Sequence, residues 1–120
     1  MIQLSLKKEV SMSRKKGDIA EDKACEFLLD KGFEISERNF YSRFGEVDII
    51  ALKNNILHFI EVKSGEDYEL AIQNITPSKL SKLTKTADVY IKKNSYEGDF
   101  CIDAVIVTPQ IIEIIENITL

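Results

Sequence analysis

Two apolar segments separated by a short polar link constrain the fold of this chain more than any other feature. Residues 44–52 and 56–63 are rich in Ile, Leu, Val and Phe, which is typical of strands in a buried sheet. Asn54 and Asn55 stand between them, and asparagine tolerates the positive φ angles that a two-residue hairpin turn requires. The sequence therefore predicts an antiparallel hairpin, with its second strand in the centre of a sheet.

This hairpin brings charged residues together. A two-residue turn sets Asp48 opposite Glu61, and the same register sets Glu46 opposite Lys63. Opposed residues point to one face with Cβ atoms roughly 4.5–5.5 Å apart, so the carboxylates of Asp48 and Glu61 should converge. Facing like charges are destabilising unless something compensates, and Mg²⁺ or Mn²⁺ does so through hard oxygen ligands. The pattern predicts a metal site at which Lys63 stabilises developing phosphate charge or positions a water. A solvated salt bridge is the alternative for a Glu-x-Lys pair taken by itself.

Amphipathic helices are predicted on both sides of the hairpin. Residues 16–31 carry apolar side chains at i, i+4, i+7 and i+8 of one stripe, and Gly32 then favours a stop. Thr76 suits an N-cap and Pro77 a first helical position, so a second helix is expected from there to about Asn94.

The remaining predicted elements are short. Further strands are expected at residues 33–40, 100–107 and 111–116, and a polar loop at residues 64–74. The final apolar run could alternatively form a short helix. The order helix, three strands, helix, two strands indicates an α/β fold in which helices flank a mixed central sheet. Residues 1–13 are expected to form a loose N-terminal extension before a single domain at 14–120.

Helix geometry adds candidate residues to the site. Glu21 lies at the edge of the first helix's apolar stripe and could reach the sheet surface, although an ordinary boundary glutamate is the alternative. Lys79 occupies a similar edge position on the second helix and could contact a phosphate. Lys82 and Lys85 turn further outward and would extend the basic surface, which a solvated helix face explains equally well.

His58, Cys25 and Cys101 are assigned to the core rather than to the site. His58 lies on the strand face opposite Glu61, which favours a packed histidine with satisfied hydrogen bonds. The two cysteines stand far apart, without another Cys or His at metal-ligand spacing. Reduced, mostly buried thiols are therefore expected in place of a zinc site or a disulfide.

Charge is segregated along the chain. The net charge is −4, but residues 18–69 hold thirteen Asp or Glu against six Lys or Arg, whereas residues 77–93 hold five Lys against one Asp. An acidic centre between basic flanks suits a cation and a phosphate, with chance segregation of solvated charges as the alternative. No apolar run resembles a signal sequence or a membrane span, so a cytoplasmic protein is expected.

Two strand segments and three further residues resemble the uncharacterised bacterial YraN family: GEVDIIA at residues 45–51, FIEVK at residues 59–63, and Glu21, Lys79 and Asp103. That family in turn resembles the PD-(D/E)XK nuclease superfamily and its Holliday-junction-resolvase-like members. The likeness extends from about residue 17 to residue 107. It implies a restriction-endonuclease-like core.

The resemblance also implies a role for each site residue. Asp48 and Glu61 would be metal ligands assisted by the backbone carbonyl of Val62, and Lys63 would be the catalytic lysine. Glu21 would be the acid of the first helix, and Lys79 the auxiliary residue of the second.

The chain departs from the family pattern at two places. Ser64 follows the strand lysine where the family commonly has Arg, and the segment from Phe100 to Asp103 has no basic residue before its Ile-Asp pair. A missing Arg means one fewer bidentate phosphate clamp, so substrate contacts through these positions are in question.

The function expected from these features is metal-dependent hydrolysis of phosphodiester bonds in nucleic acid, with Mg²⁺ or Mn²⁺ as cofactor. DNA is favoured over RNA as the substrate. The alternative is a non-catalytic nucleic-acid-binding or adaptor module that keeps the nuclease fold, and a third reading is a protein-interaction domain. Nucleic acid is the expected partner and a membrane is not. The small size leaves a homodimer open, because a second copy would extend the surface that grips a duplex.

Overall fold

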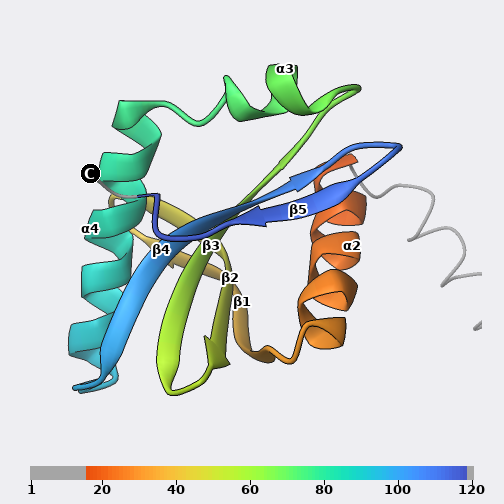
Figure 1. The fold of residues 1–120 in the computed structure, drawn as a ribbon. Helices are drawn as coiled ribbons and strands as arrows, with labels where there is room; N and C mark the ends of the chain where they lie inside the picture. Colours follow the sequence, from red (N-terminus) through yellow and green to blue (C-terminus); the bar gives the residue numbers. More distant parts are fainter. Residues whose placement is uncertain (1–15, 119–120) are drawn as a thin grey trace, which may run out of the picture.

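The computed structural model describes residues 16–118, and the predicted extension at residues 1–13 lies outside them. A single sheet forms the middle layer, with α2 against one face and α4 against the other (Figure 1). In chain order the elements are α2 (Lys16–Asp30), β1 (Glu34–Ser42), β2 (Gly45–Lys53), β3 (Ile56–Ser64), α3 (Tyr68–Ile72), α4 (Pro77–Lys93), β4 (Asp99–Val107) and β5 (Ile112–Ile115). The predicted order is confirmed, with the short helix α3 added.

The sheet is mixed, as expected. Its strands lie in the order β1-β2-β3-β4-β5, and β3 is central. Neighbouring strands are antiparallel except for β3 and β4, which run parallel. Parallel neighbours need a crossover connection, and α3 and α4 supply it here.

The predicted hairpin between β2 and β3 is confirmed. Asn54 and Asn55 both have positive φ, at 53° and 64°. The backbone pairs run from Lys53 with Ile56 to Ile49 with Ile60, which is the register that a two-residue turn dictates.

Each helix covers its own core. The apolar stripe of α2, with Ala24 and Leu28 fully buried, packs on Ile60 and Val105. On the other face Leu83 and Ala87 of α4 pack with Ile50, Leu57 and Phe59. Burying a side chain of this size stabilises the fold by roughly 1.5–3 kcal/mol, so both helices are held mainly by tertiary packing.

The helix ends follow the predicted signals. Gly32 has a φ of 91° and donates to the Leu29 carbonyl while Phe33 donates to the Leu28 carbonyl, a pair of bonds that ends α2. Thr76 Oγ1 accepts a hydrogen bond of 3.2 Å from the backbone N–H of Lys79 at the start of α4.

The prediction of an unbroken loop at residues 64–74 was wrong. Asp67 Oδ1 accepts a 2.9 Å hydrogen bond from the Leu70 N–H and so starts the single turn of α3. Ala71 of that turn packs on Ala104 and Ile106, and this tertiary contact holds a helix too short to form alone.

Near the C-terminal end of the described residues, β5 pairs with β4, so the alternative of a final helix is wrong. Among residues 16–118 no helix is both long and apolar enough to cross a membrane.

Candidate functional site

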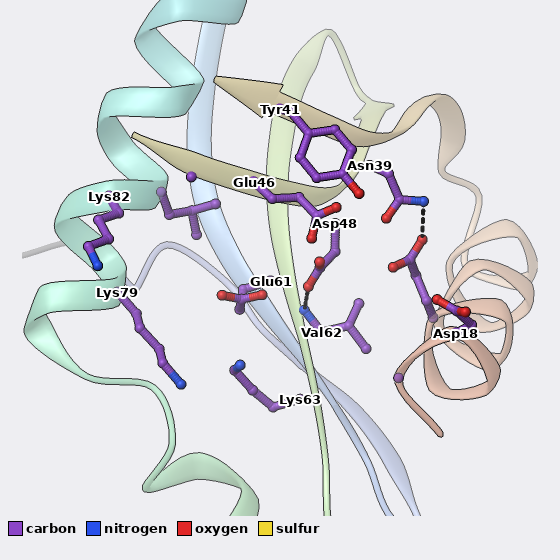
Figure 2. Close-up of a pocket in the computed structure, with 14 residues that line it drawn as sticks. Asp18, Asn39, Tyr41, Glu46, Asp48, Glu61, Val62, Lys63, Lys79 and Lys82 are labelled. Atoms are coloured by element: carbon purple, nitrogen blue, oxygen red, sulfur yellow. Dashed lines mark hydrogen bonds between the residues drawn. The ribbon is translucent and has the colours of Figure 1, made fainter. Parts of the chain in front are cut away.

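The residues singled out from the sequence line one pocket of about 440 Å³. Figure 2 shows Glu46, Asp48 and Glu61 at its centre, with Lys79 and Lys82 reaching in from α4. The helix α2 closes the opposite side. The predicted site residues on this pocket wall are Glu21, Asp48, Glu61, Val62, Lys63, Lys79 and Lys82.

The pocket opens where two strands separate. Backbone pairing between β2 and β3 ends at Ile49 and Ile60. Beyond that pair the carboxylate of Asp48 takes the place of a backbone acceptor, since its Oδ2 accepts a 2.8 Å hydrogen bond from the Val62 N–H. The side chain of Asp48 is therefore anchored to the neighbouring strand.

The backbone ladder does not include the predicted pairs of Asp48 with Glu61 and of Glu46 with Lys63. The extrapolated register was wrong at both positions. On the other side of β2, Glu46 pairs with Tyr41 of β1. The reason is the separation at Asp48, which a regular ladder does not include. Glu46 and Lys63 nevertheless line the same pocket.

The carboxylates of Asp48 and Glu61 interact strongly, as the hairpin predicted. Burial raises the pKa of Asp48 from 3.8 to about 8, and the hydrogen bond and negative charge of Glu61 act in the same direction. At neutral pH the carboxyl group of Asp48 is therefore largely protonated in the metal-free protein. A bound cation would take the place of that proton.

Glu46 adds a third acid to the centre of the pocket. Burial raises the pKa of Glu46, and the neighbouring charge of Asp48 raises it further. The hydroxyl of Tyr41 opposes this by hydrogen bonding to the Glu46 carboxylate. The acidic centre therefore includes two carboxyl groups of β2, one of which bonds to Tyr41 of β1.

Glu21 reaches the pocket from α2. Its side chain is buried, at 6% exposure, and its Oε1 accepts hydrogen bonds from Arg38 Nε at 3.1 Å and from Asn39 Nδ2 at 3.0 Å. Burial raises the pKa of Glu21 most, and Asp48 adds to the rise while Arg38 opposes it. Glu21 is therefore a fixed carboxylate close enough to Asp48 to feel its charge.

Lysines form a basic side to the same pocket. Lys63 is the residue before the last of β3, and Lys79 lies in the first turn of α4 (Figure 2). The ammonium group of Lys63 lowers the pKa of Lys79, because two positive charges lie close together. Lys82 also lines the pocket, whereas Lys85 lies with its ammonium group 5.7 Å from the ring of Phe44.

Arg38, Asn39 and Tyr41 are site residues that the sequence did not single out. All three lie on β1: Asn39 and Tyr41 line the pocket, and Arg38 contacts it through its hydrogen bond to Glu21. Asn39 has a positive φ of 54° within the strand. The signal that could have found them is the polar character of β1, unusual for a strand next to a buried hairpin.

The donor set fits a hard divalent cation. The carboxylate oxygens of Asp48 and Glu61 lie together in one partly buried place, and Lys79 is close enough for its charge to attract that of Glu61. Mg²⁺ and Mn²⁺ prefer oxygen ligands of this kind. The carbonyl of Val62 as a third ligand stays a prediction; the observed contact of Val62 is its N–H on Asp48.

His58 and Cys25 lie in the core as predicted. The His58 ring is buried and bonded through Nδ1 to the carboxylate of Asp103. Cys25 is a buried free thiol. Cys101 is free as well but only partly buried, and its sulfur contacts His58 and Asp103. The long sequence separation of these three residues hid their proximity.

The family model and the similar proteins that match this chain all belong to the same family. A sequence model described as "Uncharacterised protein family UPF0102" matches residues 20–107. A UPF0102 protein of Sulfurimonas denitrificans is 63% identical over 109 residues, covering 91% of this chain and 100% of the relative. A UPF0102 protein of Helicobacter hepaticus is 57% identical and covers 90% of this chain and 97% of the relative. One of Aliarcobacter butzleri is 56% identical and covers 91% of this chain and 100% of the relative. The family part of the predicted resemblance is confirmed, since UPF0102 proteins are YraN-like; the likeness to nucleases stays a prediction.

Proposed function

This chain belongs to the uncharacterised protein family UPF0102, and we propose that it is a metal-dependent nuclease that hydrolyses phosphodiester bonds in nucleic acid, DNA before RNA. The observation behind the proposal is that one pocket holds two sets of like charges side by side. Ionisation of Asp48 is costly beside the negative charge of Glu61, and the ammonium groups of Lys63 and Lys79 repel each other. A divalent cation would relieve the first repulsion and a phosphate the second.

Asp48 and Glu61 would hold the cation, Mg²⁺ or Mn²⁺. When bound, the ion supplies Lewis acidity and neutralises phosphate charge at that point. The hydrogen bond from the Val62 N–H fixes one oxygen of Asp48 and so orients the other oxygen. Glu21, held by Arg38 and Asn39, completes the acidic side and can hold a proton close to Asp48.

The lysines would bind the nucleic acid. Lys63 stabilises the negative charge that develops on the phosphate during hydrolysis, because it lies two residues after Glu61 on the same strand and lines the same pocket. Lys79 and Lys82 contact the phosphate backbone from the first turns of α4.

The fold proposed with this function is a restriction-endonuclease-like core. Its support is the placement of the acids. Glu21 comes from the first helix, Asp48 and Glu61 come from adjacent antiparallel strands, and the next helix contributes the basic side chains. The parallel strand β4 then follows this helix beside β3.

Cleavage assays on the full chain test the proposal. Duplex, single-stranded, flap and junction DNAs and an RNA are incubated with Mg²⁺, with Mn²⁺ or with chelator. Cleavage is expected only with metal and is expected to fall at least about 100-fold in Glu61→Gln. Glu113→Gln is the matched control, because Glu113 is an exposed strand glutamate outside the pocket. Absence of cleavage on every substrate, or cleavage that persists in Glu61→Gln, would overturn the proposal.

A non-catalytic nucleic-acid-binding module is the second candidate. The observation that favours it is the basic row on α4 combined with Ser64 at the position after the strand lysine. Binding that depends on salt but not on Mg²⁺, without product, would favour this module over the nuclease.

A further inference from the structure

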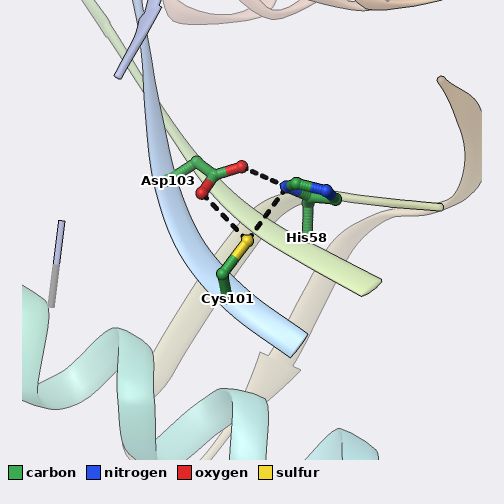
Figure 3. Close-up of side chains that lie close together, drawn as sticks. All are labelled: His58, Cys101 and Asp103. Atoms are coloured by element: carbon green, nitrogen blue, oxygen red, sulfur yellow. Dashed lines mark hydrogen bonds and ion pairs between the residues drawn. The ribbon is translucent and has the colours of Figure 1, made fainter. Parts of the chain in front are cut away.

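Three side chains of metal-ligating type meet outside the acidic pocket. His58 of β3 and Cys101 and Asp103 of β4 lie together on the face of the sheet that α2 covers (Figure 3). Their ligand atoms all lie within 4.8 Å of one another. None of the three lines the pocket of Asp48 and Glu61.

Strand register brings these residues together. In the parallel pairing of β3 and β4, His58 is opposite Cys101 and Ile60 is opposite Asp103. Residues 101 and 103 therefore point to the same face as His58, because side chains alternate along a strand. The parallel arrangement itself depends on the crossover through α3 and α4.

We propose that His58, Cys101 and Asp103 bind one transition metal ion of the zinc class. An imidazole nitrogen, a thiolate and a carboxylate form a donor set that suits Zn²⁺ and not Mg²⁺. In a tetrahedral zinc site, the metal–ligand distances place neighbouring ligand atoms roughly 3.3–3.7 Å apart. Cys101 Sγ lies 3.1 Å from His58 Nδ1 and 3.3 Å from Asp103 Oδ1, close to that spacing. His58 Nδ1 and Asp103 Oδ2 are 2.5 Å apart, so binding an ion requires these two atoms to separate by about 1 Å. Binding replaces the thiol proton of Cys101, which leaves to solvent.

The surroundings hold the three ligands in place. Asp103 is fully buried, and its Oδ1 accepts a 2.9 Å hydrogen bond from the backbone N–H of Asn117. The ring of Phe33 packs edge-on against His58, with centroids 4.9 Å apart. Such outer contacts fix the orientation of metal ligands. The partly buried Cys101 leaves an approach for the ion.

The geometry does not suit a catalytic Cys-His-Asp triad. In a triad the two ring nitrogens divide the work, one facing the nucleophile and the other the acid. Here the same atom, His58 Nδ1, contacts both Cys101 Sγ and the Asp103 carboxylate. Three ligand atoms that converge on one another fit a shared ion better than a relay of protons.

Cobalt titration of the full chain tests the site. Co²⁺ reports zinc-type sites through a thiolate-to-metal charge-transfer band, which is expected to saturate at one ion per chain and to disappear when Zn²⁺ is added. Cys101→Ser should abolish the band and weaken Zn²⁺ binding at least about 100-fold, the upper end of what the loss of an outer contact costs. Cys25→Ser is the matched control and should keep the band, because Cys25 lies outside the cluster. Wild-type protein without a band, or a band that survives Cys101→Ser, would overturn the proposal.

Alkylation of the wild-type chain gives a second test that needs no variant. Zn²⁺ should slow the reaction of Cys101 with iodoacetamide, and a chelator should restore it, as read by peptide mass spectrometry. Equal alkylation with and without Zn²⁺ would contradict the site. Asp48→Asn separates the two proposals, since this change in the acidic pocket should leave the cobalt band and the protection of Cys101 unchanged.

Discussion

Asp48 lies at the point where β2 and β3 stop pairing, and its carboxylate has two partners there. One is the Val62 N–H, which holds the side chain in place. The other is the carboxylate of Glu61, which together with burial makes ionisation of Asp48 costly. A carboxyl group whose pKa is raised in this way, inside a pocket, is typical of a residue that binds a ligand.

The pH dependence of stability tests this view of Asp48. Its pKa is 3.8 in an unfolded chain and about 8 in the fold, so the folded chain binds more protons between these values. The free energy of unfolding of the metal-free protein should therefore fall as pH rises from about 4 to about 8. Asp48→Asn keeps an acceptor for Val62 and removes this loss, so at pH 8.5 it should be more stable than wild type by on the order of 2 kcal/mol.

Urea unfolding at several pH values with chelator measures the effect, with Glu113→Gln as the control. The free energy of unfolding should change with pH more steeply in wild type than in Asp48→Asn between about pH 4 and about pH 8. Added Mg²⁺ should stabilise wild type and leave Asp48→Asn unchanged, because the ion binds only the native acidic pocket. Identical slopes for wild type and Asp48→Asn would contradict the raised pKa of Asp48.

At the scale of elements, α4 contributes both to the core and to the pocket. Its apolar side, with Leu83 and Ala87, completes the core on one face of the sheet. Its first turns hold Lys79 and Lys82 at the pocket. The cap at Thr76 determines where the helix begins, and so determines where Lys79 lies relative to Lys63.

Thr76→Ala should lower the free energy of unfolding by about 1 kcal/mol, because the N-cap oxygen that Thr76 offers to Lys79 is lost. It should also weaken nucleic-acid binding, since the first turn frays. Thr84→Ala is the control on the same helix: its hydroxyl bonds back to the Leu80 carbonyl, an interaction that adds little stability. Chemical denaturation measures both variants, and equal losses for the two would argue against the cap.

At the scale of the whole molecule, the charges are separated although the net charge is −4. The acids of α2, β2 and β3 meet in the pocket, and the lysines of α4 stand beside them. A molecule of this kind can attract a phosphate chain locally while its total charge opposes broad, unspecific binding.

The salt dependence of DNA binding tests that arrangement. Glu61→Gln serves as the background, because it should bind DNA without cutting it. Its binding to duplex DNA, measured by fluorescence anisotropy, should weaken as salt rises. Adding Lys82→Gln should reduce the slope of log K against log salt concentration by about 0.9. Lys92→Gln should change it little, since Lys92 forms an ion pair with Asp88 at the far end of α4 and lies outside the pocket. A slope that Lys82→Gln leaves unchanged would remove Lys82 from the interface. The mass of the protein in the same buffer, measured by light scattering, shows whether the binding unit is one chain or a homodimer.

The sequence by itself determined the features that depend on neighbouring residues. Asn54 and Asn55 specify the turn, Gly32 and Thr76 specify helix ends, and alternation specifies which face of β3 carries Glu61. These are local effects of backbone geometry, so they can be read without knowing the rest of the fold. The hairpin register then brought most of the acidic pocket within reach of prediction.

Only the tertiary structure decided the features that join distant segments. The parallel register of β3 and β4 places His58 beside Cys101, 43 residues away, and the packing of α2 places Glu21 against Arg38. The separation of β2 from β3 at Asp48 also depends on the strands and helices around it. The physical reason is that such contacts arise from how whole elements pack, and packing depends on the summed shape of the core rather than on any short run of residues.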